Sequence, residues 1–490
     1  MAANITLLPS DIVIIFMHHL SARDLAALCC TCRILRDLVD EFGWKDYLKR
    51  HPRQSLSLSM ASASWSSGAQ VKYNMIADHN WKRQHFVARP LSQRWTGKLQ
   101  PLLTINSSRL LLAAGNTIYS YGFSASAGPD VSPPVRLECA YTTSAFHPNR
   151  DITALTSLPD NGSDRTIVVG YADGNLERVT LPPCAEPAAQ SGHIDASLRE
   201  RYDFHDGSLI EGLSVSASHL LSLSSTGTAA FTSLASTELA PELVDVGTRC
   251  WSCHLEMGAS SPYAAFGQTS LDPLSVHHIS ESHISPQPSI LLSSATPAER
   301  STAVYAISSA PPACAWGASK EILVSGWYDG IVRIFDLRTP THLSADGAPS
   351  LLPCMSICDP WTPEPIYSLS CGGGSASHIA AGSARHSVLA FWDVRAHTRG
   401  WSVHAPGNDS SPVYSVVMDG ARVFGANESR AFVFDFGPGV NEATYPPVVV
   451  EPEPAWRGVG RWRKAGADDG LKRAQREGPG FYVTKYRHSK

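Results

Sequence analysis

The stretch Ile322–Asp336, ILVSGWYDGIVRIFD, contains two short apolar runs on either side of a tight turn. β-Branched and aromatic residues fill both runs, and the dipeptide Asp329-Gly330 between them is typical of hairpin turns. The stretch therefore predicts a β-hairpin. Similar units, which bring the total to about seven, occur at 379–393 and 167–179 and, in weaker form, at 110–123, 219–234, 263–276 and 422–436.

The repeat indicates the fold class of most of the chain. Its turns are separated by roughly 40 to 60 residues, close to the length of one four-stranded propeller blade with loop insertions. The units resemble WD repeats in the turn pattern Ser-Gly-x-x-Asp-Gly and in the terminal pair Trp392-Asp393, of which Phe335-Asp336 and Phe434-Asp435 are near versions. The resemblance implies an all-β, WD-repeat-like propeller of about seven blades over residues 99–440, with six or eight blades left open.

Strands and loops of this repeat can be placed from the same pattern. Inner strands are expected before several hairpins, at 151–155, 209–215, 304–307, 366–369 and 413–417. The strand that closes the ring is expected at 85–88 or at 481–486, where FYVTKY alternates as a strand should. Insertions rich in Pro and Ser are expected to be surface loops rather than strands, at 182–191, 282–301 and 340–363.

The N-terminal stretch Leu8–Trp44, LPSDIVIIFMHHLSARDLAALCCTCRILRDLVDEFGW, predicts three short helices. The first, from about Ser10 to Leu20, carries apolar residues in nearly every direction, whereas a helix of a small domain normally has one apolar stripe. A capping-box arrangement at Ser21–Asp24 begins the second helix, and apolar residues at intervals of three and four mark the third. About fifty residues cannot bury all these side chains, so we expect another protein to cover some of them. Packing on the rest of the chain is the alternative.

The same stretch resembles the F-box motif. The residues that carry the resemblance are Leu8-Pro9, Asp11-Ile12, Ile15-Phe16, Leu20, Asp24-Leu25, Cys32-Arg33, Leu35, Leu38 and Trp44. It implies that the segment docks on the Skp-type adaptor of a cullin-RING (SCF) ubiquitin ligase. The residues that would contact the adaptor or form the core of the motif, two roles that the sequence does not separate, are Leu8, Pro9, Ile12, Ile15, Leu20, Leu25, Leu28 and Leu35.

The chain is therefore expected to combine α and β parts in several domains. Residues 1–50 would be the F-box, and residues 99–440 the propeller. Between them, 51–98 would be a linker and short helical connector, because the Ser-rich stretch 51–70 cannot bury enough surface to fold. The mildly basic tail, 441–490, would be partly disordered or supply a closing strand, and nucleic-acid binding there is not expected.

Composition fits a protein of several parts. The 490 residues are 43% hydrophobic, and the net charge of -4 predicts no strong electrostatic attraction to nucleic acid or membranes. Because the N-terminus lacks a basic segment followed by a long apolar run, we expect no signal peptide and an intracellular location, in the cytoplasm, the nucleus or both. The 11 cysteines show no regular spacing and are expected to be mostly reduced thiols.

Two local patterns suggest other chemistry. The sequence Cys250-Trp251-Ser252-Cys253-His254 matches a c-type haem attachment site or half of a zinc site, with Cys354 and Cys358 as a second half. We interpret these cysteines as buried strand residues instead. Gly372-Gly373-Gly374-Ser375 lacks the Lys of a phosphate-binding loop and is interpreted as a turn between strands. We therefore expect no metal, no cofactor and no catalytic residues.

Two functional hypotheses follow, from different classes. In the first, the chain is a substrate receptor whose F-box binds the adaptor and cullin while the propeller captures a target protein for ubiquitination. In the second, it is a WD-repeat scaffold that delivers no substrate. An enzyme is the least favoured class. Scattered arginines argue against recognition of phosphate. The residues expected on the target-binding rim are Tyr171, Asp173, Tyr328, Asp329, Arg385, His386, Glu428 and Arg430.

Overall fold

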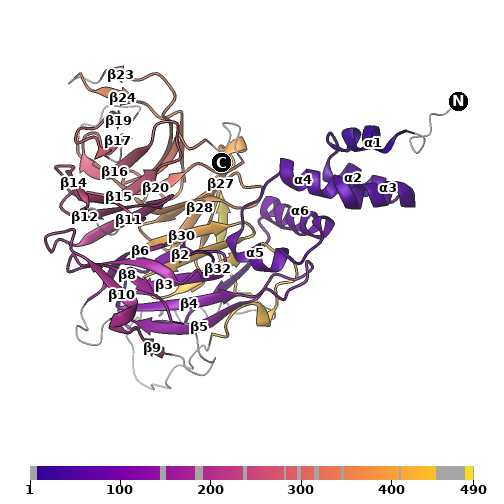
Figure 1. Ribbon diagram of the computed structural model, residues 1–490, viewed down its shortest axis with the longest axis horizontal. Helices are drawn as coiled ribbons and strands as arrows, with labels where there is room; N and C mark the ends of the chain where they lie inside the picture. Colours follow the sequence, from indigo (N-terminus) through magenta and orange to yellow (C-terminus); the bar gives the residue numbers. More distant parts are fainter. Residues whose placement is uncertain are drawn as a thin grey trace, which may run out of the picture.

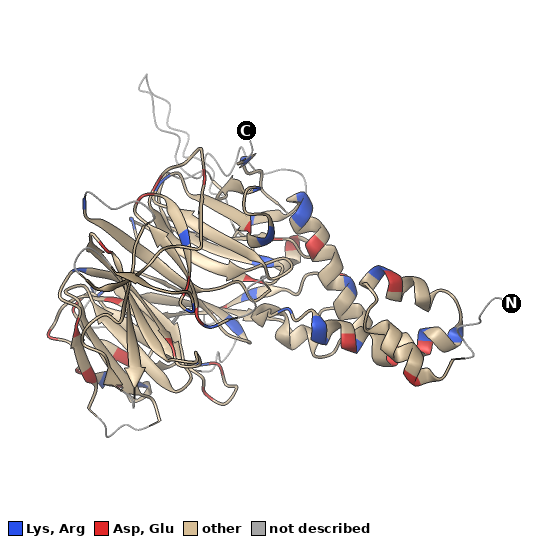
Figure 2. Ribbon diagram, turned by 90° about the horizontal axis from the view of Figure 1, so that it is seen from above, with Lys and Arg blue, Asp and Glu red and all other residues tan. Residues whose placement is uncertain are grey.

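The computed structural model describes residues 8–143, 150–182, 191–235, 240–280, 283–294, 300–313, 319–343, 347–407, 410–448 and 480–488. N-terminal helices project from a larger body of β-strands (Figure 1), and Figure 2 shows from above that they extend from one side of it. No described helix is both long and apolar enough to cross a membrane. The helices are α1 (Ser10–Met17), α2 (Ala22–Cys29), α3 (Arg33–Leu38), the π-helical η2 (Val39–Gly43), α4 (Trp44–Arg50), α5 (Leu56–Ser62) and α6 (Ser67–Arg83).

Antiparallel meanders of four strands build the β body, and among the described residues there are seven of them. The first four are β2 (Leu102–Ile105), β3 (Arg109–Ala114), β4 (Thr117–Phe123), β5 (Val135–Thr142); β6 (Ile152–Ser157), β7 (Thr166–Tyr171), β8 (Leu176–Thr180), β10 (Arg199–Tyr202); β11 (Ile210–Ser216), β12 (His219–Ser224), β13 (Thr228–Ser233), β14 (Glu242–Asp245); and β15 (Cys250–Glu256), β16 (Tyr263–Ser270), β17 (Leu274–Ser280), β19 (Ile290–Leu292).

The other three meanders complete the body, and short strands extend some sheet edges. The three are β20 (Thr302–Ser309), β21 (Ile322–Trp327), β22 (Ile331–Asp336), β25 (Met355–Cys358); β26 (Ile366–Gly372), β27 (His378–Ser383), β28 (Val388–Asp393), β29 (Trp401–His404); and β30 (Val413–Asp419), β31 (Arg422–Asn427), β32 (Ala431–Asp435) with β1 (Val87–Pro90). The edge strands are β9 (Ser191–His193), β18 (His283–Ile284), β23 (His342–Leu343), β24 (Pro349–Leu351) and β33 (Lys485–Arg487).

The first strand of each meander lies next to the first strand of the following one, and we call these seven the inner strands. The contacts run from β2 through β6, β11, β15, β20, β26 and β30, and β30 contacts β2 again, so the cycle closes. β1 pairs with β32, with Ala88 opposite Phe434, so residues that precede the first meander complete the last one. Of the two segments expected to supply a closing strand, 85–88 overlaps β1, which pairs with β32, and 481–486 overlaps β33, which pairs with β29.

The hairpins and inner strands expected from the sequence are present. Ile322–Asp336 forms β21 and β22, and each of the five expected inner strands overlaps a strand of the cycle. The expectation that 282–301 and 340–363 contain no strands is wrong, because they supply β19 and β25, the fourth strands of their meanders, and β24. Their Pro and Ser content hid short pairing segments that neighbouring strands stabilise. Most of 182–191 lies outside the described residues.

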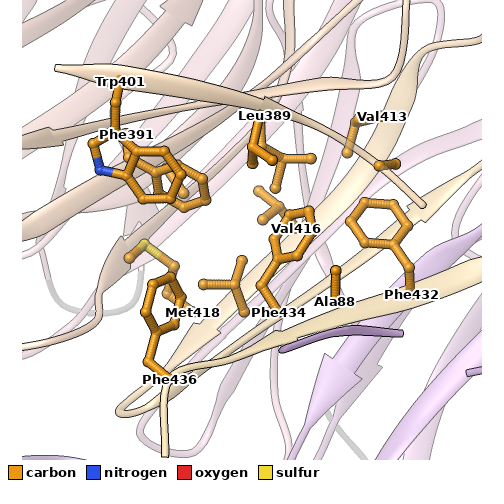
Figure 3. Packing of buried hydrophobic residues seen from close by; sticks show 14 of the residues in the cluster. Ala88, Leu389, Phe391, Trp401, Val413, Val416, Met418, Phe432, Phe434 and Phe436 are labelled. Carbon is orange, nitrogen blue, oxygen red and sulfur yellow. The ribbon is translucent and has the colours of Figure 1, made fainter. Parts of the chain in front are cut away.

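Apolar side chains fill the space between neighbouring sheets. Figure 3 shows this packing between the last two meanders, where Leu389, Phe391 and Trp401 face side chains of β30 and β32, including Phe432 and Phe434. The rings of Phe391 and Trp401 stack with centroids 4.5 Å apart. Neighbouring sheets cover both faces of a sheet in this way. Strands such as β21 are therefore buried along their whole length and lack the alternation of apolar and polar residues that marks a half-exposed strand.

The Ser-rich segment 51–70 is not an unfolded linker, and that prediction is wrong. Its residues 56–62 form α5, where the carboxylate of Asp419 accepts hydrogen bonds from the backbone N–H groups of Leu56 (2.6 Å) and Ser57 (2.9 Å). Leu58 of α5 is buried against the β body near Ala421. The β body therefore supplies the helix cap and the apolar contacts that the composition of the segment lacks.

The next helix, α6, is also fixed to the β body, at the turn between β26 and β27. The side chain of Asn80 donates a hydrogen bond to the carbonyl of Phe436 at 2.8 Å. Gly373 and Gly374 have positive φ, and a Cβ on either would come within about 3 Å of the Trp81 ring. The glycine run is thus a strand-to-strand turn, as the sequence indicated, and its lack of side chains makes room for Trp81.

Candidate functional site

The N-terminal helices enclose a small core of their own. Val13, Met17, Leu25, Leu35 and Val39 are buried in it. These five side chains come from α1, α2, α3 and η2, so helices too short to be stable alone are held together by shared burial.

The capping box expected at the start of α2 is present. The Asp24 N–H donates to Ser21 Oγ at 3.3 Å, and the Ser21 N–H donates to Asp24 Oδ2 at 3.2 Å. Hydrogen bonds from Ser21 lower the pKa of the Asp24 carboxyl. The reciprocal bonds fix where α2 begins and therefore how it meets α1.

Other apolar side chains of these helices remain exposed to solvent. Ile15 is 55% exposed, Phe16 53% and Ile34 61%, although each is large enough to be worth burying. Ile12, Ile15 and Phe16 share one side of α1 at helical spacings of three and four. The exposed large apolar side chains, which we call the exposed F-helix set, are Leu8, Ile12, Ile15, Phe16, Ile34 and Phe42.

The structure separates two roles that the sequence left together. Of the eight residues expected to contact a partner or form the core, Leu25 and Leu35 are buried in the core, and Leu20 and Leu28 are half-buried beside it. The exposed members are Leu8, Pro9, Ile12 and Ile15. Phe16, Ile34 and Phe42 were not in the expected set, although Phe16 lies four positions from both Ile12 and Leu20, a helical spacing visible in the sequence.

These helices coincide with a known domain. Residues 5–46 match the family model of the F-box domain. The chain carries an F-box. F-box domains bind Skp-type adaptors in SCF complexes, and the exposed F-helix set lies within the matched residues. The comparison with curated proteins finds no match to this chain.

The F-box is joined to the β body through α6. The indole of Trp44 in α4 lies against Gly68, where a Cβ would come within 3.1 Å of the ring. Arg53 forms an ion pair with Asp78 of α6 and donates a hydrogen bond to the carbonyl of Gly374 at 2.6 Å. The contacts link the F-box, α6 and the turn between β26 and β27 in one continuous packed path.

Two residues expected on the target-binding rim are buried instead. Tyr171 is covered by the guanidinium of Arg150, 3.8 Å from its ring centroid, and its hydroxyl donates to Glu177. Arg430 is 1% exposed. Both expectations are wrong. Tyr171 ends β7 and Arg430 immediately precedes β32, and their surroundings cover both side chains, which a hairpin pattern does not reveal.

The other expected rim residues lie at or near the surface, some of them held by local partners. Asp329 accepts two hydrogen bonds from Arg333, and Asp173 pairs with Arg150 at 2.8 Å. These contacts fit turn-forming roles. Glu428 is half-buried, whereas the exposed members of the set are Asp173, Tyr328, Asp329, Arg385 and His386.

A cavity of about 300 Å³ lies where the inner strands begin. Six inner strands carry a β-bulge in their pairing with the next strand, at a single residue that has no partner. The same six residues line the cavity, namely Thr153, Glu211, Trp251, Tyr305, Tyr367 and Tyr414. Since a bulge turns a side chain away from the regular pleat, the repeated bulge directs one side chain per strand to this place. None of the six was among the residues expected from the sequence to bind a target.

The cavity and the F-box connection lie at opposite ends of the same strand. Tyr414, near the start of β30, lines the cavity, and Asp419, its last residue, caps α5. Five residue steps along the strand separate them, which corresponds to about 17 Å. The cavity therefore opens on the side of the β body away from α5.

The other chemical motifs have structural explanations. Cys250 and Cys253 lie in β15, and burial raises the pKa of the Cys250 thiol to about 12, which disfavours the thiolate that metal binding requires. The expectation that Cys354 and Cys358 are buried is wrong, because both are exposed, Cys358 at the end of the outer strand β25 and Cys354 immediately before it. Burial also lowers the pKa of His254 to about 4. Within the described residues no group of three or more His, Cys, Asp or Glu side chains is placed to hold a metal ion.

Proposed function

We propose that this F-box protein is the substrate-recognition subunit of an SCF-type E3 ubiquitin ligase. The F-box would bind the Skp-type adaptor and through it the cullin, and the β body would bind a target protein. The observation that carries the proposal is the exposed F-helix set, which stays in solvent although a separate apolar core is complete. Burial of these side chains under an adaptor surface would stabilise the complex by roughly 1.5 to 3 kcal/mol for each side chain that is fully covered.

We also propose that the seven meanders are the blades of a WD-repeat-like β-propeller. The closed cycle of inner strands supports this, and so does the completion of the last meander by β1, because a ring that is closed by a strand from the other end of the chain leaves no open edge. In such a ring the target would bind where the inner strands begin, at the cavity lined by the bulge residues.

In this proposal the chain itself catalyses nothing. It would hold the lysines of the target close to the ubiquitin-carrying subunits, so that transfer becomes effectively intramolecular. The packed path from the F-box through α6 to the β body supports such a role, because a defined separation is needed for proximity to be useful. The ubiquitinated target would pass to proteasomal degradation, and the protein would act in the cytoplasm, the nucleus or both.

Adaptor binding by the full chain tests the proposal. We expect purified protein to retain the Skp-type adaptor with its cullin in a pull-down, and the double substitution Leu8→Ala with Pro9→Ala to weaken retention. Leu243→Ala, an exposed apolar residue of β14, is the matched control and should have no effect. A folded wild-type protein that retains no adaptor would refute the adaptor-binding part.

Ubiquitin transfer then distinguishes a substrate receptor from the alternative, a scaffold that joins the adaptor without delivering targets. Proteins that co-purify with the β body would be added to the reconstituted ligase. The receptor hypothesis expects their ubiquitination to require the F-box protein, whereas a scaffold would bind them and leave them unmodified.

A further inference from the structure

We propose that the cavity at the start of the inner strands binds a basic side chain, arginine or lysine, of the target protein. The inference rests on the proposed function, because it takes the occupant to be a segment of the target. It adds the chemical class of the feature that is recognised, which the F-box does not specify. Three features of this end of the β body favour a cation, namely an aromatic wall, a carboxylate and the pairing of the nearby arginines.

Aromatic rings form a continuous arc along one wall of the cavity. The ring centroids of Trp251 and Tyr305 lie 5.0 Å apart, those of Tyr305 and Tyr367 5.1 Å, and those of Tyr367 and Tyr414 6.1 Å. The four residues come from the successive inner strands β15, β20, β26 and β30. Because the face of an aromatic ring is negative, each of these rings offers a surface on which a cation on an apolar stem can stack.

A carboxylate adds negative charge to the same cavity. Glu211 of β11 has a side chain that is 19% exposed, and its ion-pair partner, Arg249, lies at 3.4 Å, near the outer limit for a charged hydrogen bond. Burial raises the pKa of Glu211 to about 7, even with Arg249 beside it. One distant and half-exposed guanidinium therefore offsets little of the cost of burying this charge, and a second cation would be favoured.

Two residues of the cavity lining, Trp251 and Glu211, already contact one cation in the proposed manner. The guanidinium of Arg249 lies 4.0 Å from the ring centroid of Trp251 while it faces Glu211. A stacked ring and a carboxylate thus act together on a single positive group. Tyr305 and Tyr367 continue the same wall and carry no such partner among the cation–ring contacts of the described residues.

An acidic or phosphorylated target segment fits this end of the β body less well. Arg150 pairs with Asp173 and Glu177, Arg249 with Glu211, and Arg385 with Glu364 at 3.6 Å. An incoming phosphate would compete with these carboxylates for the arginines and would be repelled by them. The charge balance therefore favours a basic ligand.

Peptide mixtures test the inference on the full-length protein. Five sets of nonapeptides would be used, with random flanks and a fixed central arginine, lysine, glutamine, glutamate or phosphoserine. We expect immobilised wild-type protein to retain the arginine and lysine sets roughly tenfold better than the glutamine set, as a desolvated cation–π contact with a carboxylate allows. Glu211→Gln and Tyr367→Ala should remove this preference, whereas Tyr367→Phe, which keeps the ring, should preserve most of it.

Glu200→Gln is the matched control, because Glu200 is an ion-paired glutamate on the outer strand β10. It should leave the preference unchanged. Preference for phosphoserine or glutamate, equal retention of all sets, or retention of none would overturn the inference. Adaptor binding is measured on the same preparations. Wild-type protein that binds the adaptor but shows no preference for the arginine and lysine sets would refute only the inference. Wild-type protein that shows the preference but binds no adaptor would refute only the adaptor-binding proposal.

Discussion

The indole ring of Trp81 lies parallel to the phenyl ring of Phe436, with centroids 3.8 Å apart and an angle of 9° between the planes. Trp81 belongs to α6 and Phe436 follows β32, so two residues 355 positions apart join the connector to the last meander. The contact is buried, since Trp81 is 2% exposed. The distance between the F-box and the cavity therefore depends on how α6 packs on the last meander.

Trp81→Ala should therefore destabilise the protein by about 3 to 5 kcal/mol, the usual range for truncating a buried tryptophan. Because α6 loses its main contact, protease cleavage between α4 and β1 should accelerate more than cleavage elsewhere. Chemical denaturation and limited proteolysis measure the two effects. Trp361→Ala, at a site 55% exposed, serves as the control and should change neither the stability nor the cleavage pattern. If cleavage of the Trp81→Ala variant stayed uniform along the chain, that result would contradict the anchoring role.

Asp419→Ala should loosen α5 without unfolding the F-box. It removes the acceptor for the N–H groups of Leu56 and Ser57, and loss of a helix cap costs about 1 to 2 kcal/mol. Hydrogen exchange of the α5 amides should become faster, while α1 to α3 keep their protection. Asp203→Ala, in an exposed ion pair, is the control. Unchanged exchange in α5 would show that its apolar contacts alone hold it.

Substitutions in the F-box should divide into two groups. Ile15→Ala and Phe16→Ala should each weaken adaptor binding about tenfold or more and change the free energy of unfolding little, because both side chains are exposed. Leu25→Ala, at a fully buried site, should lower the free energy of unfolding by about 2 to 5 kcal/mol. Calorimetric titration with the adaptor and thermal unfolding measure both quantities. Strong destabilisation by Phe16→Ala would mean that this ring is part of the core.

The stability of the β body should depend on pH through Glu211. Its pKa rises from a usual value of 4.5 to about 7 on folding, with Arg249 as the opposing charge, so the folded state binds the proton more tightly than the unfolded state between these values. The free energy of unfolding should therefore fall as the pH rises from 4.5 to 7, by up to about 3 kcal/mol.

Glu211→Gln removes this dependence and should raise the unfolding temperature at pH 8 but not at pH 4. The difference between variant and wild type, followed by thermal unfolding across this range, isolates the contribution of the one carboxyl. Glu200→Gln should show no such trend. A variant less stable than wild type at pH 8 would mean that the pair with Arg249 outweighs the cost of burial.

Local patterns in the sequence were sufficient for the parts of the fold that are local in origin. The turn at Asp329-Gly330 fixed the hairpin of β21 and β22, and Ser21 with Asp24 fixed the start of α2. In each case the residues that interact are a few positions apart, so turn chemistry and helical or strand spacing describe the whole interaction. The F-box was identifiable for the same reason, since its residues are contiguous.

Long-range neighbours decided the rest. The sequence could not separate Ile15 from Leu25, because their burial depends on how the short N-terminal helices pack together. It could not foresee that Asp419 caps the Ser-rich α5, because Asp419 and Leu56 lie 363 positions apart. It also gave no sign that Glu211 and Tyr367 share one cavity, since a bulge is set by strand pairing. The sequence by itself determined the repeating units and the F-box, through interactions within short segments, and only the tertiary structure decided which side chains converge, because closing the cycle of strands brings distant residues to the same place.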